Sequence, residues 1–98
     1  MEQITFLDKI KYMLYLARDK KYKDEDITLL EEYANEHSNN LVLGRFMGYS
    51  ISDYALATLR WLNTEKTINI FNRLFDGLDA QRKNEVSELI SSEAYLNI

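Results

Sequence analysis

Apolar residues recur every three or four positions along most of this sequence, which is the repeat of an α-helix. The pattern is clearest in two sets near the N-terminus: Leu7, Ile10, Leu14 and Ala17, and then Ile27, Leu30 and Ala34. Proline, which interrupts helices, is absent, and no stretch shows the strict alternation of a strand. The 98 residues therefore predict one all-α domain over residues 1–98, a compact bundle of five or six short helices without a sheet.

Capping residues and glycines divide the chain into these helices. The first opens near Phe6 and ends before a connection at 20–23, and the second starts at the acidic residues 24–26 and ends at 38–40. The same signals predict four later helices. The third spans 41–47, and the fourth runs from Ser50 or Ser52 to about Leu62. The fifth ends at Asp76–Gly77 with the glycine in a left-handed conformation, and the sixth is capped by Asp79. The tail, residues 91–98, forms one more turn or frays.

The amino-acid composition excludes most kinds of catalytic and metal-binding site. Cysteine is absent and His37 is the single histidine, so disulfides, thiolate nucleophiles and multi-histidine metal sites are excluded. The acidic run 24–26 lacks the glycine and spacing of a calcium loop, and no phosphate-binding loop or serine elbow is present. We therefore expect no catalytic residues, no metal and no cofactor.

Neither a membrane span nor a secretory leader is visible. No apolar run approaches the ~20 residues that cross a bilayer. Residues 1–5 lack a basic segment followed by a long apolar one. We expect a cytoplasmic protein without membrane contact.

Charge is distributed unevenly along the chain. Residues 1–23 hold six basic and three acidic side chains, whereas residues 24–40 hold six acidic side chains and no basic one. Adjacent short helices usually pack as neighbours, so these charges would largely cancel locally. Alternatively, they form two faces of opposite sign, one of which attracts a charged partner.

The middle of the chain carries a recognisable constellation. Gly44 and Gly48 are four residues apart, and Ser50 or Ser52 can cap the helix that follows. Apolar side chains stand at the offsets that pack two helices together: Leu43, Met47, Tyr49, Tyr54 and Ala57. Residues 40–61 thus resemble the helix-turn-helix of small bacterial and phage regulators. The resemblance implies a helix-turn-helix-like centre and a DNA-binding function, with four candidate contacts: Arg45, Ser50, Ser52 and Arg60.

The residue types in this segment disfavour DNA as the partner. Four positions would face base edges, and they are mostly apolar: Ile51, Ser52, Ala55 and Leu56. A duplex binder usually neutralises several phosphates, yet the formal net charge is −4. Gly44 and Gly48 are equally consistent with tight helix packing inside a bundle. DNA-binding transcriptional regulation is therefore the alternative function.

Aromatic side chains near the N-terminus indicate a different function, protein binding. Tyr12, Tyr15 and Tyr22 are interleaved with Lys9 and Lys11 near the N-terminus. Tyrosine is favoured at interfaces because it buries a large area and keeps a polar group. We predict that these five residues form a protein-binding face of a small non-catalytic interaction module. Its partner is another protein or a second copy, and its composition suggests a regulator or inhibitor from a bacterium or phage.

Overall fold

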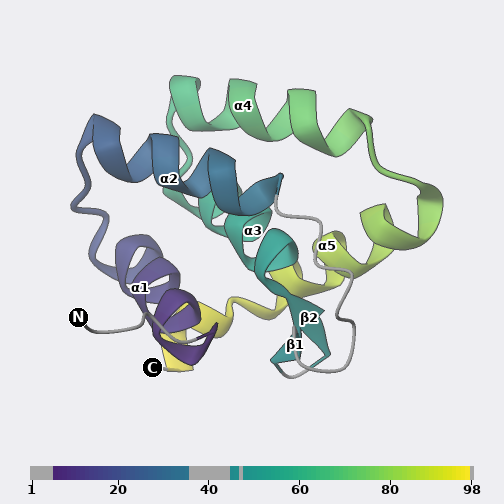
Figure 1. Ribbon diagram of the computed structural model, residues 1–98, viewed down its shortest axis with the longest axis horizontal. Helices are drawn as coiled ribbons and strands as arrows, with labels where there is room; N and C mark the ends of the chain where they lie inside the picture. Colours follow the sequence, from purple (N-terminus) through teal and green to yellow (C-terminus); the bar gives the residue numbers. More distant parts are fainter. Residues whose placement is uncertain (1–5, 36–44, 47, 98) are drawn as a thin grey trace.

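The computed structural model describes residues 6–35, 45–46 and 48–97. The described chain contains five α-helices, one two-stranded hairpin and a final 3-10 turn (Figure 1). In chain order these are α1 (Phe6–Asp19), α2 (Asp24–Ala34), β1 (Arg45–Phe46), β2 (Tyr49–Ser50), α3 (Ile51–Leu62), α4 (Glu65–Asp76), α5 (Ala80–Ser92) and η1 (Ala94–Asn97). The predicted all-α class is confirmed.

Helix α3 lies at the centre of the molecule. It contacts α1, α2, α4 and α5, which surround it in Figure 1. Ten of its 12 residues are buried, and Arg60 is exposed. The small side chains of Ala55 and Ala57 let neighbouring helices approach closely, since both are fully buried. The core is therefore built around one helix rather than between two layers.

The start of α3 is fixed by a reciprocal cap. Ser50 Oγ accepts a hydrogen bond from the Asp53 backbone N–H at 3.2 Å, and Asp53 Oδ2 accepts one from the Ser50 N–H at 3.0 Å. The helix ends where Asn63 takes a left-handed conformation, at φ 55°. Of the two predicted caps, Ser50 is the one that the fold uses.

The predicted helix over 41–47 is wrong at Arg45 and Phe46. These residues form β1, which pairs antiparallel with β2 so that Phe46 lies opposite Tyr49. Gly48 has a φ of +91°, a conformation that glycine adopts without steric cost, and it lets the chain reverse between the strands. The expectation of no sheet is corrected to this hairpin, whose two strands have two residues each. Residues 41–44 and 47 lie outside the described part of the chain.

One other helix boundary, one backbone conformation and one side-chain position differ from the sequence-based expectations. Helix α2 ends at Ala34, before the predicted end at 38–40, which is outside the described residues. Gly77 follows α4 as expected, but its φ of −82° is right-handed. Leu7 was expected on the buried face of α1 and is 43 % exposed, because that face is centred on Ile10, Met13 and Ala17.

Candidate docking surface

A line of exposed side chains runs along α1. Leu7, Lys11, Tyr15 and Arg18 follow at intervals of four, four and three residues, which places them on one helix face. We call these four residues the α1 strip. The strip lies away from the buried side chains of the same helix, so its position follows from how α1 packs on α3.

The α1 strip is partly apolar. Leu7 and Tyr15 are each 43 % exposed, and Leu96 of η1 is 59 % exposed. Among the residues whose side-chain exposure the structure describes, which exclude Phe6 and Phe46, these three are the large exposed hydrophobic ones. Because η1 contacts α1 (Figure 1), all three belong to two adjacent elements.

Positive charge accompanies these apolar side chains. The Arg18 guanidinium carbon lies 4.8 Å from the centre of the Tyr15 ring, a cation–π geometry. Arg18 Nε also donates to Asp19 Oδ1 at 3.1 Å, but both side chains are well exposed and such pairs contribute little to stability. Lys11, Lys20 and Lys21 are exposed on the same helix and its following connection. The surface therefore combines hydrophobic contact area with exposed cations, and Asp8 and Asp19 are exposed on the same helix.

Two of the predicted binding residues join α1 to α2 instead. Tyr12 is half-buried and its hydroxyl donates to the Asp26 carboxylate. Burial, and then the hydrogen bond to Asp26, raise the pKa of Tyr12, while the Tyr12 hydroxyl and the Lys23 backbone N–H lower the pKa of Asp26. The Lys9 ammonium lies 5.1 Å from the centre of the Tyr33 ring.

The structure thus divides the five predicted protein-binding residues. Lys11 and Tyr15 lie on the α1 strip, whereas Tyr12 and Lys9 contact α2 and Tyr22 is half-buried against the core. Sequence reasoning missed Leu7, Arg18 and Leu96. Arg18 was detectable, since it follows Lys11 at helical spacing, but Leu96 gives no periodic signal.

The predicted DNA contacts are not gathered on an exposed helix face. Ser52 is 3 % exposed, donates to the Ala34 carbonyl at 2.7 Å and accepts from Arg82 Nη2 at 3.0 Å. Its hydroxyl is therefore buried and hydrogen-bonded within the fold. Ser50 caps α3, Arg60 is exposed and donates to Asn63 Oδ1 at 3.3 Å, and Arg45 lies in β1.

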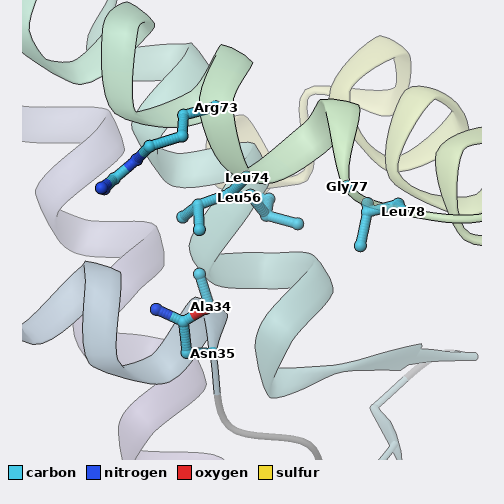
Figure 2. A pocket seen from close by; sticks show the side chains of 7 residues that line it. All are labelled: Ala34, Asn35, Leu56, Arg73, Leu74, Gly77 and Leu78. Carbon is cyan, nitrogen blue, oxygen red and sulfur yellow. The ribbon is translucent and has the colours of Figure 1, made fainter.

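A half-open hollow of about 230 Å³ lies between the ends of α2 and α4 (Figure 2). Leu56, Leu74 and Leu78 supply most of its apolar lining. Of the lining residues Arg73 alone is charged, and its Nη2 donates to Glu31 Oε2 at 2.6 Å. The hollow could accommodate a small apolar group, and its lining brings no acid–base pair together.

The described residues also contain no group of three His, Asp or Glu side chains that could hold a metal ion. His37 lies outside them. Asp24 of the acidic run is in an ion pair with Lys66 at 3.3 Å.

Comparisons with protein-family models, with curated proteins and with solved structures find no match to this chain. In the described part of the chain, every helix is too short or too polar to cross a bilayer.

Proposed function

We propose that this protein is a non-catalytic interaction module that docks a protein partner on the α1 strip and Leu96. The observation that carries the proposal is the position of the exposed hydrophobic side chains. Leu7, Tyr15 and Leu96 all lie on α1 or on η1, which contacts it. An exposed apolar area bordered by polar residues is typical of an interaction surface.

The charges beside this surface define the partner's chemistry. Lys11 and Arg18 stand between or beside the apolar side chains, and no acidic side chain belongs to the strip. Electrostatic complementarity favours a partner surface that is acidic as well as apolar. The wider role that fits such a small docking module is that of a cytoplasmic regulator or inhibitor from a bacterium or phage.

A synthetic helical peptide with leucine and glutamate on one face tests the proposal directly. We expect it to bind the wild-type protein, as measured by fluorescence anisotropy. Tyr15→Ala should weaken binding about tenfold, because a central interface tyrosine contributes on the order of 1–2 kcal/mol. The double variant Lys11→Glu/Arg18→Glu should weaken it further.

Arg60→Glu is the matched control, since it reverses an exposed charge at the end of α3 and leaves the α1 strip intact. Circular dichroism verifies that each variant is folded. Absence of peptide binding to the wild-type protein at concentrations where it is monomeric, or equal affinity in Tyr15→Ala and Arg60→Glu, would contradict the proposal.

DNA binding receives no comparable support. The helix that would enter the major groove is α3, and it is covered by four other helices. A DNA contact would have to use Arg60 and the basic end of α1. Helix-turn-helix proteins instead place a recognition helix in the major groove.

A further inference from the structure

We infer that the partner of the α1 strip is a second copy of this chain, with α1 of each copy lying antiparallel on α2 of the other. This inference rests on the proposed function, and it adds the identity of the partner. The evidence is a second exposed strip whose charges and spacing complement those of the α1 strip.

The second strip lies on α2. Glu25, Thr28, Glu32 and Asn35 are exposed and follow at intervals of three, four and three residues, so they share one helix face and its end. We call these residues the α2 strip. Helix α2 contains no basic residue, so this outward face is purely acidic and polar. Leu29 and Tyr33, half-buried on the same helix, provide apolar area beside it.

The two strips match in the spacing of their charges. Lys11 and Arg18 are seven residues apart on α1, and Glu25 and Glu32 are seven residues apart on α2. Seven residues advance about 10.5 Å along a helix. An antiparallel arrangement therefore places Lys11 opposite Glu32 and Arg18 opposite Glu25 at the same time.

The same register also suits the remaining positions. Tyr15, midway between the two cations, falls opposite Thr28, which lies midway between the two carboxylates. In this register Leu7 lies beyond Asn35, the last residue of the α2 strip. The arrangement buries the Tyr15 ring against a short side chain and places no like charges of the two strips opposite each other.

In a two-fold symmetric dimer each copy uses both of its strips once, so the α1–α2 contact forms twice. Helices α1 and α2 are neighbours in the same copy, joined by the Tyr12–Asp26 hydrogen bond and by Lys9 on the Tyr33 ring. A two-fold axis running between them would set α1 on the partner's α2 and α2 on the partner's α1. Such an isologous interface is complete with two copies and forms no filament.

Charge reversal in trans gives a sharp test. One variant carries Lys11→Glu and Arg18→Glu, and the other carries Glu25→Lys and Glu32→Lys. Each variant alone would face like charges in both halves of the interface, whereas a mixed dimer would have opposite charges in both halves. Sedimentation velocity from micromolar to millimolar concentration should show a dimer for the wild type, and association about tenfold weaker for each variant alone.

Mixing the two variants in equal amounts should restore the dimer. Arg60→Glu is again the control and should associate like the wild type, and circular dichroism should show equal helix content in all samples. A wild type that stays monomeric, or a mixture that associates no better than either variant alone, would overturn the inference.

The dimerisation experiment and the peptide experiment can fail independently of each other. A monomeric wild type that still binds the acidic peptide through Tyr15 would refute the second copy as the partner and leave the docking function standing. If neither the peptide nor a second copy binds, both proposals fail.

Discussion

At the scale of single residues, Asp53 makes the most consequential contacts. It is fully buried, caps α3 through Oδ2 and accepts from Arg82 Nη2 through Oδ1 at 2.9 Å. Ser52, beside it, connects Arg82 to the Ala34 carbonyl. The cluster joins the start of α3 to α5 and to the end of α2. Removing one partner of a buried ion pair leaves an uncompensated charge, which is far costlier than losing an exposed pair.

Asp53→Ala should therefore lower the free energy of unfolding by about 3–5 kcal/mol. Asp19→Ala is the matched control, because Asp19 pairs with Arg18 at an exposed site and should cost less than ~1 kcal/mol. Urea unfolding followed by circular dichroism measures both. Equal losses in the two variants would show that the buried cluster is not a stabilising contact.

Tyrosine burial predicts how stability depends on pH. Burial raises the pKa of Tyr54 to about 12, and burial together with Asp26 raises the pKa of Tyr12. Both groups hold their protons more tightly in the folded state, so the stability they contribute is complete below pH ~10, the unfolded value, and is lost as the pH rises above it.

We expect urea unfolding midpoints to fall between pH 10 and 12, and we expect Tyr12→Phe to reduce the steepness of that fall. Tyr15→Phe is the control at an exposed tyrosine. If the unfolding midpoint of Tyr12→Phe fell with pH as steeply as that of the wild type, this would be evidence against a buried, hydrogen-bonded Tyr12 hydroxyl.

At the scale of the elements, helix ends show where sequence signals are sufficient. Ser50, Thr64 and Asp79 each accept a hydrogen bond from the backbone N–H three residues later, and all three capping types are readable in the sequence. The C-terminal ends are less predictable. Asn63 and Glu93 take left-handed conformations there, whereas Gly77, the residue best suited to one, does not.

Glu93 is strained because it ends α5 with a φ of 48°. Glu93→Gly should raise the free energy of unfolding by roughly 0.5–1 kcal/mol, since glycine adopts this conformation without a Cβ clash. Glu88→Gly, in the middle of α5, should lower it by about 1 kcal/mol. Thermal unfolding of the two variants measures the contrast, and shifts in the same direction would exclude a left-handed end at Glu93.

At the scale of the whole molecule, the central position of α3 separates this fold from a DNA-reading one. A recognition helix must project from the surface, but here its four neighbours cover it. The formal net charge of −4 adds no attraction to a polyanion.

We therefore expect no binding to duplex DNA at low salt in a fluorescence titration, for the wild type and for Arg60→Glu alike. If the protein instead bound duplex DNA with an affinity that fell steeply with salt, and Arg60→Glu weakened that binding, the result would support the alternative function of DNA-binding regulation.

Local sequence determined the helical class and most helix starts, because helical periodicity and capping depend on residues within one or two turns. It also placed Lys11 and Tyr15 among the candidate binding residues. It could not separate Tyr15 from Tyr12, because both are tyrosines beside lysines on the same helix and only the position of α2 decides which one is covered. The hairpin at 45–50 was missed for a related reason: its strands are two residues long and show no periodicity.

By itself, then, the sequence determined that the chain is helical, where most helices begin, and that one end is basic and the next segment acidic. The tertiary structure alone decided that α3 is the centre, that Ser52 is buried, and that Leu7, Tyr15 and Leu96 remain exposed. The physical reason is that amphipathic spacing defines an apolar face for each helix, whereas the neighbour that covers each face, and the side chains left uncovered, depend on how all the helices pack together.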